Sequence, residues 1–132
     1  MSGNEGLKKQ SLGRFGEDKA ADYLISEGFE ILERNFRCRS GEVDIICKNS
    51  EYIVFAEVKL RKNDRFGSAM EFVTYTKQRK VITASEYYVM KNMQGAGVSL
   101  QPRFDVIEVY APHGEAGDVC INHIEDAFSV NF

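Results

Sequence analysis

Two carboxylates and one lysine are the residues of this 132-residue chain whose types and spacing could do chemistry. Glu57 and Lys59 lie in Tyr52–Leu60, a segment rich in β-branched and aromatic residues that is therefore predicted to be a strand. Because side chains alternate along a strand, Glu57 and Lys59 should leave it on the same side. Asp44 lies in a neighbouring predicted strand, from which antiparallel pairing would bring it to the same place.

A cluster of this composition is suited to a divalent metal ion. Charges at the edge of a core each cost roughly several kcal/mol unless they pair or bind an ion. Two carboxylates, with nearby carbonyls and waters, are ligands that magnesium or manganese prefers. Such an ion can activate water and neutralise a phosphodiester, while Lys59 orients the water or stabilises developing charge. The competing interpretation is an ordinary salt bridge between Glu57 and Lys59; the presence of Asp44 strengthens the case for a catalytic site, and both interpretations stay open at this point.

A first helix and a meander of strands should position these residues. The helix is predicted over about Phe15 to Glu27 and should stop at Gly28. Residues 1–11 are expected to be a flexible tail, and residues 12–132 a single domain. The inward stripe of the helix contains a carboxylate and consists of Glu17, Ala20, Ala21 and Leu24. Short turns then predict an antiparallel meander of three strands, over Phe29–Arg37, Glu42–Lys48 and Tyr52–Leu60.

The middle strand of this meander carries Asp44. Alternation predicts that Val43, Ile45 and Cys47 share one face of the strand, and that Glu42, Asp44 and Ile46 share the other. Asp44 should therefore lie on one side of the sheet, away from Val43.

A second helix is predicted from about Lys77 to Met90, with Thr76 as its cap and Lys77 one turn before its apolar stripe. That stripe consists of Val81, Ala84, Ser85 and Tyr88. Loops are expected over residues 61–73 and 94–102. Further strands are predicted over Phe104–Tyr110, beside the meander, and over residues 119–124. This order predicts an α/β fold with a mixed sheet flanked by helices.

Charge is unevenly distributed along the chain. The net charge is -3, yet residues 34–80 contain 11 basic and 6 acidic residues, and no Lys or Arg follows Arg103. The basic middle could contact phosphates, and chance clustering on a solvated surface is the competing interpretation. Cysteine and histidine spacing argues against a zinc site. Because the sequence shows no signal peptide or membrane-spanning stretch, we expect a cytoplasmic protein with no membrane partner.

The ordered set of motifs resembles two related groups of proteins. Asp44 followed by Glu57-Val58-Lys59 resembles the PD-(D/E)xK nuclease superfamily, which includes restriction enzymes and archaeal Holliday-junction resolvases, although Val43 stands where that superfamily has proline. The chain also resembles the bacterial YraN-like family over nearly its whole length. The segments that carry this resemblance include Gly16-Glu17, Gly41-Glu42-Val43-Asp44-Ile45-Ile46, Phe55-Ala56-Glu57-Val58-Lys59, Lys77-Gln78 and Arg103-Phe104-Asp105-Val106. The resemblance implies a restriction-endonuclease-like fold.

The same resemblance implies roles for the central residues. Asp44 and Glu57 would hold magnesium or manganese, and Lys59 would be the catalytic lysine. The implied reaction is hydrolysis of phosphodiesters in DNA, in particular branched or repair-intermediate DNA. Resolution of a four-way junction would need two sites related by a two-fold axis, and hence a homodimer. Residues expected to contact the DNA are Arg37, Arg39, Arg61, Lys62, Arg79 and Lys80.

Three further residues match the family pattern at its edges. Glu17 matches the accessory acid of resolvase-like members, and Lys77 or Gln78 matches a polar residue contributed by the following helix. The competing interpretation of Glu17 and Lys77 is that they are helix charges extending to water. Two other functions remain open from the sequence: a non-catalytic nucleic-acid-binding module, and a protein-interaction adaptor that uses the acidic C-terminal region.

Overall fold

The computed structural model of the chain describes residues 2–62, 73–92 and 100–129, with side chains described from Gly13 onward. The helices, strands and single 3₁₀ turn of these residues are α1 (Ser2–Ser26), β1 (Glu30–Cys38), β2 (Gly41–Lys48), β3 (Tyr52–Arg61), α2 (Tyr75–Asn92), β4 (Gln101–Tyr110), η2 (Gly114–Ala116) and β5 (Cys120–Phe128). This is the predicted order, with two strands after the second helix. Most of the predicted loops over 61–73 and 94–102 lies outside the described residues.

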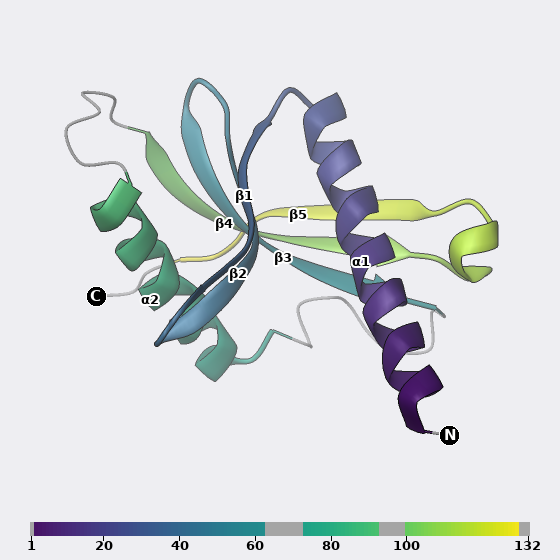
Figure 1. Cartoon of the computed structure of the whole chain (residues 1–132). Helices are drawn as coiled ribbons and strands as arrows, with labels where there is room; N and C mark the ends of the chain where they lie inside the picture. The colour runs from purple at the N-terminus through teal and green to yellow at the C-terminus, as the bar shows by residue number, and fades with distance from the viewer. Residues whose placement is uncertain (1, 63–72, 93–99, 130–132) are drawn as a thin grey trace.

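The five strands form one mixed sheet in the order β1-β2-β3-β4-β5. The first three are the predicted antiparallel meander, β4 pairs parallel with β3, and β5 pairs antiparallel with β4. A parallel pair needs a long crossover connection, and the segment containing α2 supplies it. The sheet is strongly twisted, so that its strands fan out from the middle (Figure 1). The predicted α/β fold with a mixed sheet flanked by helices is confirmed.

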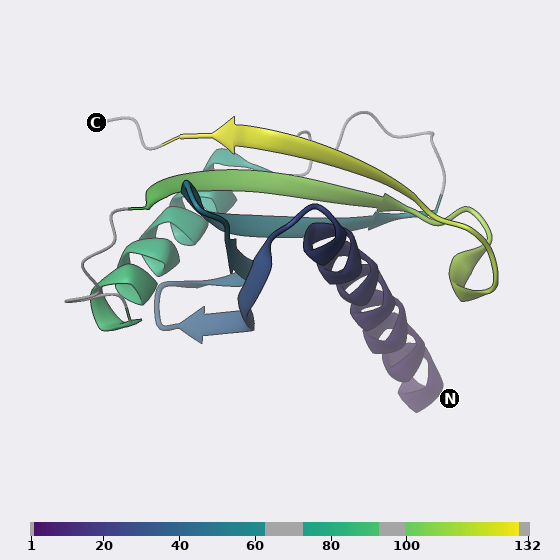
Figure 2. The same ribbon diagram turned by 90° about the horizontal axis from the view of Figure 1, so that it is seen from above.

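Each face of the sheet carries a hydrophobic core beneath one helix (Figures 1 and 2). Val54 and Ala56 of β3 pack with buried residues of α1. Ile53 and Phe55, which alternate with them, pack with buried residues of α2. The predicted separation of the two faces of β3 is therefore confirmed. Since Glu57 continues the series of Ile53 and Phe55, its side chain leaves β3 toward α2.

The first helix is longer than predicted at its start and ends where predicted. α1 begins at Ser2, so its backbone is helical within the segment that was expected to be a flexible tail. At its end, Gly28 has a φ of 93°, and the N–H of Phe29 donates to the carbonyl of Leu24 at 3.0 Å. This is a Schellman motif, in which the positive φ favours glycine. Phe29 and Leu24 then join the same core, which fixes the path from α1 into β1.

The second helix begins two residues earlier than predicted and has a different cap. α2 begins at Tyr75, and Oγ1 of Thr74 accepts a hydrogen bond from the N–H of Lys77 at 3.2 Å. The prediction of Thr76 as the cap is wrong, because Thr76 already lies inside the helix. The predicted apolar stripe is confirmed, with Val81, Ala84, Ser85 and Tyr88 all buried. Neither helix of the described residues is long and apolar enough to cross a membrane.

The tip of the β1–β2 hairpin lies against α2. A Cβ atom at Gly41 would lie only 2.6 Å from the carbonyl oxygen of Lys80, so a side chain would not fit there. Val43 packs in the core on the α2 side, whereas Ile45 and Cys47 pack in the core on the α1 side. The prediction that these three residues share one face is therefore wrong. The ladder between β2 and β3 ends at Ile45, and the remainder of β2 turns toward the helix.

Both edge strands of the sheet are irregular. The register between β1 and β2 shifts between Ile31 and Glu33. The register between β4 and β5 shifts between Phe104 and Val106, near Asp126 of β5, whose φ is 52°. Such bulges leave extra residues unpaired and bend the strand that carries them.

A buried polar network joins β4, β5 and α1. Asp105 is fully buried and accepts hydrogen bonds from Nε and Nη2 of Arg103, at 3.0 and 2.8 Å, and from the N–H of Asp126 at 3.0 Å. Nε2 of His123 lies 2.7 Å from the same carboxylate, and its Nδ1 lies 2.9 Å from the hydroxyl of Tyr23 on α1. The network therefore ties the first helix to the last two strands.

Candidate functional site

Asp44 lies where β2 and β3 part. The ladder between the two strands ends at the pair Ile45–Ala56. One residue further along β2, Oδ2 of Asp44 accepts a hydrogen bond from the backbone N–H of Val58 at 2.8 Å. The carboxylate thus accepts a hydrogen bond that a backbone carbonyl of β2 would accept if the ladder continued. This bond holds Asp44 beside Glu57, close enough for the two charges to act on each other.

Glu57 is enclosed between β3 and the first turn of α2. Its side chain is 1% exposed, and Nζ of Lys77 lies 3.0 Å from its Oε2. Lys59, two residues along β3, is near enough to Asp44, Glu57 and Lys77 for their charges to shift its pKa. The structure therefore brings two carboxylates and two lysines together, three of them from the strand pair and one from α2.

The electrostatics of this cluster are those of a site with poorly compensated charge. Burial, and after it the charge of Asp44, raise the pKa of Glu57 to about 7, although Lys77 and Lys59 act in the opposite direction. Burial also raises the pKa of Asp44, against the hydrogen bond from Val58. Burial and the charge of Lys77 lower the pKa of Lys59. A cation bound between the carboxylates would favour their charged forms.

The donor set fits a divalent cation that keeps part of its water shell. Oε1 of Glu57 is buried and has no hydrogen-bond donor among the residues that the structure describes. A buried charged oxygen without a partner is costly, and a cation would satisfy it. Within the same residues no group of three or more His, Cys, Asp or Glu side chains could hold a metal. Two carboxylates with several waters is a coordination that magnesium commonly adopts.

Replacing Glu57 by Gln should stabilise the protein at pH 8 and have little effect at pH 5. The pKa of Glu57 is raised from 4.5 to about 7, so the folded state keeps a proton that the unfolded state has lost. Stability of the wild type should thus fall as the pH rises from 4.5, by about 3 kcal/mol once the pH exceeds 7. Gln resembles the protonated form and does not titrate. Urea unfolding at the two pH values measures the difference.

The matched control is Glu51→Gln, since Glu51 is exposed in the turn before β3. This variant should follow the wild type at both pH values. An effect of Glu57→Gln that is equal at pH 5 and pH 8 would contradict the description of Glu57 as a buried, proton-retaining carboxyl.

Glu17 lies on the α1 side of the cluster. Its Oε2 accepts a hydrogen bond from Nδ2 of Asn35 at 3.0 Å and lies 3.6 Å from Nη2 of Arg34, both on β1. Burial is the main influence that raises the pKa of Asp44, and the charge of Glu17 adds to it. Glu17 therefore contacts β1 and lies within electrostatic range of Asp44. Its predicted approach to Lys59 or to a metal ion stays a prediction.

Of the two residues predicted from the second helix, the structure brings Lys77 to the cluster. Gln78 instead serves the start of α2, where its Nε2 donates to the carbonyl of Val73 at 3.0 Å and its backbone N–H donates to the carbonyl of Thr74 at 2.9 Å. Gln78 thus helps to hold the helix start from which Lys77 extends.

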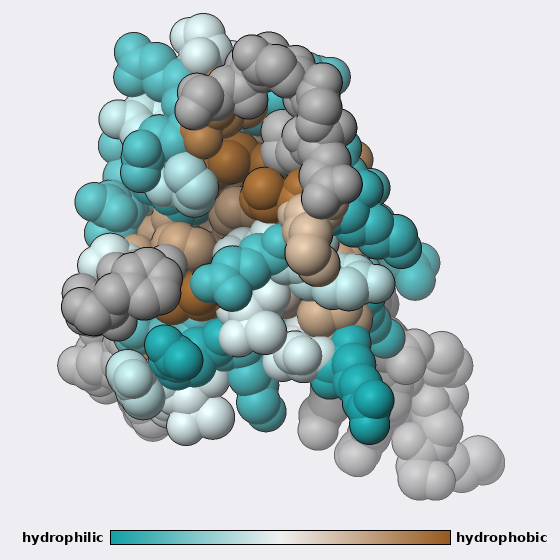
Figure 3. All heavy atoms as spheres, turned by 90° about the vertical axis from the view of Figure 1, so that its left-hand side faces the viewer, coloured by the Kyte–Doolittle hydropathy of each residue, from teal (hydrophilic) through white to brown (hydrophobic). Residues whose placement is uncertain are grey.

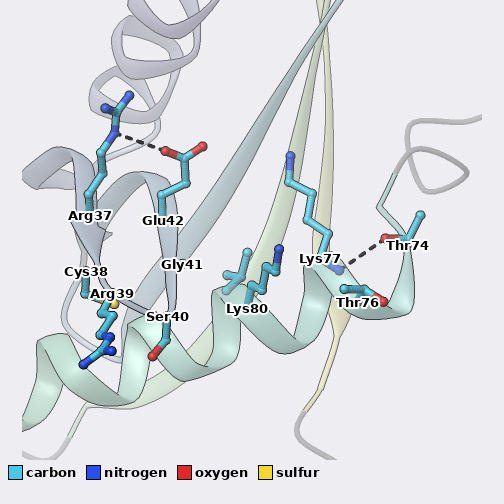
Figure 4. A pocket seen from close by; sticks show the side chains of 11 residues that line it. Arg37, Cys38, Arg39, Ser40, Gly41, Glu42, Thr74, Thr76, Lys77 and Lys80 are labelled. Atoms are coloured by element: carbon cyan, nitrogen blue, oxygen red, sulfur yellow. Dashed lines mark hydrogen bonds and ion pairs between the residues drawn. The ribbon is translucent and has the colours of Figure 1, made fainter.

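A hollow of about 540 Å³ lies between the tip of the β1–β2 hairpin and the first turns of α2 (Figure 4). Lys77 lines this hollow and also contacts Glu57 of the cluster. We call this hollow the hairpin groove. Its basic residues are Arg37, Arg39, Lys77 and Lys80, and its hydroxyl groups come from Ser40, Thr74 and Thr76. Among the described residues that line it, the one carboxylate is that of Glu42, which pairs with Arg37 at 3.1 Å. Surplus positive charge with hydroxyl donors is typical of phosphate-binding surfaces.

The surface around this groove is polar. Figure 3 shows the side of the molecule that carries α2, and hydrophilic residues dominate its lower part, where the hairpin tip and the first turns of α2 lie in Figure 1. Apolar residues gather higher on the same face. The hairpin tip and the start of α2, between which the groove lies, are thus on the more hydrophilic part of this face.

The other predicted DNA contacts lie elsewhere. Arg61, at the end of β3, pairs with Glu108 of β4 at 2.9 Å, and both side chains are largely buried. Arg61 also lines a separate hollow of about 200 Å³ beside β5. Lys62 is exposed after β3, and Arg79 is exposed on α2 without lining the groove. The structure thus groups part of the predicted basic set and separates Arg61 from it.

The roles that three residues have around the site were not predicted. Asn35 and Arg34 hold Glu17 from β1. Asn35 has a φ of 54°, a conformation that Asn adopts more readily than most residues, and no local pattern indicates it. Glu42 adds to the raised pKa of Asp44, which is due first to burial. Its place two residues before Asp44 on one strand is a signal that could have found it.

Fold and site together define the class of this protein. A mixed sheet with a helix on each face, an aspartate where one strand leaves its neighbour, and Glu-x-Lys on that neighbour make it a restriction-endonuclease-like α/β protein. Residues 16–109 match the model of the Uncharacterised protein family UPF0102, and the chain belongs to this family. The match confirms the resemblance to the YraN-like family, and it spans the whole candidate site.

Relatives from several bacteria are similar along most of the chain. A UPF0102 protein of Caldicellulosiruptor saccharolyticus is 46% identical over 123 residues, which cover 92% of this chain and 100% of the relative. One of Clostridioides difficile is 43% identical, with the same coverage of 92% and 100%. One of Hahella chejuensis is 43% identical over 102 residues, covering 76% of this chain and 79% of the relative. These descriptions state a family and no activity.

Proposed function

We propose that this protein is a metal-dependent DNA endonuclease. The observation that supports this most directly is the buried carboxylate of Glu57, grouped with Asp44 and two lysines beside the hairpin groove. A carboxylate pair that fits a divalent cation and a basic surface that fits phosphates are the two parts that phosphodiester hydrolysis needs. Branched or repair-intermediate DNA is the proposed substrate class, with a homodimer as the assembly for four-way junctions.

Each residue of the cluster has a role in this proposal. Asp44 and Glu57 would hold magnesium or manganese. When bound, the ion supplies charge neutralisation at the phosphate and lowers the pKa of a bound water. Lys59, whose pKa is lowered by burial and by Lys77, would donate a hydrogen bond to the attacking water or to a phosphate oxygen. Glu17 would contribute negative charge from the α1 side, held in place by β1.

The basic residues of the hairpin groove would hold the DNA backbone. Arg37, Arg39 and Lys80 would neutralise phosphates on the side of the cluster that faces α2. These contacts position the strand without reading its bases, which suits an enzyme that recognises DNA shape. Arg61 is paired with Glu108 and is left out of this interface.

The proposal is tested on a panel of linear, flapped and four-way DNAs with identical arms, incubated with magnesium, manganese or EDTA. Cleavage is expected with either metal and not with EDTA. Lys59→Met should lower the rate at least about a hundredfold, because it removes a charge-stabilising donor. The matched control is Lys48→Met, at the other end of the β2–β3 ladder, where Lys48 is 3.7 Å from Glu30. This variant should cleave like the wild type.

The negative outcomes are equally informative. DNA binding without cleavage under any metal would indicate a non-catalytic nucleic-acid-binding module. Failure of both binding and cleavage would favour a protein-interaction adaptor. Either result overturns the proposed reaction.

A further inference from the structure

Lys77 faces two environments at once. Its Nζ lies 3.0 Å from Oε2 of Glu57, yet its side chain is 38% exposed, whereas that of Glu57 is 1% exposed. The same side chain lines the hairpin groove, where it rises from α2 beside Lys80 (Figure 4). Because a lysine is a point charge on a flexible four-carbon stem, Lys77 can exchange one partner for the other without moving the helix.

The balance of charge gives this exchange a consequence. When all four groups are ionised, Asp44 and Glu57 together carry two negative charges, and Lys59 and Lys77 carry two positive ones. A divalent cation placed between the carboxylates would therefore lie beside two ammonium groups that repel it. Repulsion would decrease if one ammonium group moved away. Lys77 has a second place to go, in the groove, whereas Lys59 extends from the central strand itself.

An anion in the groove would favour this movement. Arg37, Arg39 and Lys80 line the groove, and Glu42, which is the one carboxylate among its described lining residues, is already paired with Arg37. A tetrahedral anion there would attract Lys77 as a further cation, and hydroxyl groups of the hairpin tip and of the helix start could donate to it. The ammonium group would then leave Glu57 as the anion arrives.

We propose that Lys77 is a shared counter-ion, which moves from Glu57 to a phosphate group bound in the hairpin groove, so that phosphate binding and divalent-cation binding at Asp44 and Glu57 promote one another. This inference rests on the proposed metal site and adds its regulation by the substrate. Coupling of this kind is reciprocal, so each ligand strengthens the other by the same factor. The metal site would be completed chiefly when nucleic acid is present.

The test measures Mn²⁺ binding to the full chain by titration calorimetry at pH 8, with no nucleic acid. Each variant is measured in sodium chloride and in sodium sulfate of equal ionic strength, with sulfate as the probe for a phosphate group. For each variant, the Mn²⁺ affinity in sulfate is divided by the affinity in chloride. This ratio does not depend on how the substitution changes the intrinsic affinity for Mn²⁺. Wild-type affinity should rise about tenfold in sulfate. In Lys77→Met the two affinities should agree within about twofold, because the shared counter-ion is gone.

The matched control is Lys80→Met, which removes a groove cation one turn along α2. In this variant the Mn²⁺ affinity should respond only at higher sulfate concentrations, but its maximal increase should be the same tenfold as in the wild type. A tenfold rise that persists in Lys77→Met would show that sulfate acts on the metal directly, and would overturn the inference. Mn²⁺ binding that is lost in Asp44→Asn but is equally strong in sulfate and in chloride would also overturn the inference. The proposed metal site would still be supported by that result. No Mn²⁺ binding in any variant would overturn both proposals. Thermal melts check that each variant is folded.

Discussion

Asp44→Asn is expected to reduce DNA cleavage about a thousandfold while DNA affinity and folding are retained. Asn has nearly the same shape, and its amide oxygen can still accept the hydrogen bond from Val58, so the junction of β2 and β3 should keep its geometry. The substitution removes one of the two negative charges proposed to hold the ion. If the ion contributes about 4 kcal/mol to the transition state, its loss corresponds to about three powers of ten in rate.

Single-turnover cleavage and fluorescence anisotropy measure the two quantities separately. The control is Asp118→Asn, an exposed aspartate in the loop before β5, which should change neither. Cleavage by Asp44→Asn at the wild-type rate would remove Asp44 from the proposed machinery, whatever the DNA affinity.

The largest expected loss of stability comes from the other face of the sheet. Asp105→Asn should lower the free energy of unfolding by about 3–5 kcal/mol, because it leaves the buried guanidinium of Arg103 without its counter-charge. His123 and the N–H of Asp126 also lose a charged acceptor. Denaturant unfolding at pH 7 measures the loss. Asp22→Asn, on the exposed face of α1, is the control and should change stability by less than about 0.5 kcal/mol.

The pH dependence of this network has a sign opposite to that of Glu57. Burial alone would raise the pKa of Asp105, but hydrogen bonds from His123, Arg103 and Asp126 outweigh it and hold the pKa below its usual value of 3.8. Such a group stabilises the fold at pH values above 3.8, and this contribution is lost as the pH falls through the lowered value. The Asp105→Asn penalty should therefore shrink in acid. A penalty that is constant down to the lowest pH would contradict the role of the charge.

Strand alternation is the part of the site that sequence predicts well. β3 is paired with β4 along its whole length and with β2 over Ile53–Ala56, so its side chains alternate without interruption. That regularity is why it was predictable from β3 alone that Glu57 and Lys59 leave the strand on the same side. Lys77 was predictable for a similar reason, because it precedes a regular apolar stripe on α2 by one turn.

The errors fall where regular pairing stops. Val43 lies beyond the end of the β2–β3 ladder. Its contact with α2, and not strand alternation, determines in which of the two hydrophobic cores it is buried. Thr74 replaces Thr76 as the cap because α2 begins at Tyr75, shortly after Val73, which is buried in the core on the α2 side. The network around Asp105 joins residues of β4 and β5 and reaches α1 through His123, and no local pattern unites them. Long-range contacts of this kind are outside the reach of periodicity.

The bulges in the two edge strands bear on how copies of this chain could meet. A straight edge strand offers a row of unpaired backbone groups that a second chain can extend, which leads to dimers by strand addition or to aggregation. β1 breaks this row between Ile31 and Glu33, and β5 breaks it near Asp126. Acidic side chains at Glu33 and Glu125 add charge to both edges. The fold is thereby protected against edge-to-edge aggregation, and a two-fold dimer of this protein would be built on side-chain surfaces instead of a continuous sheet.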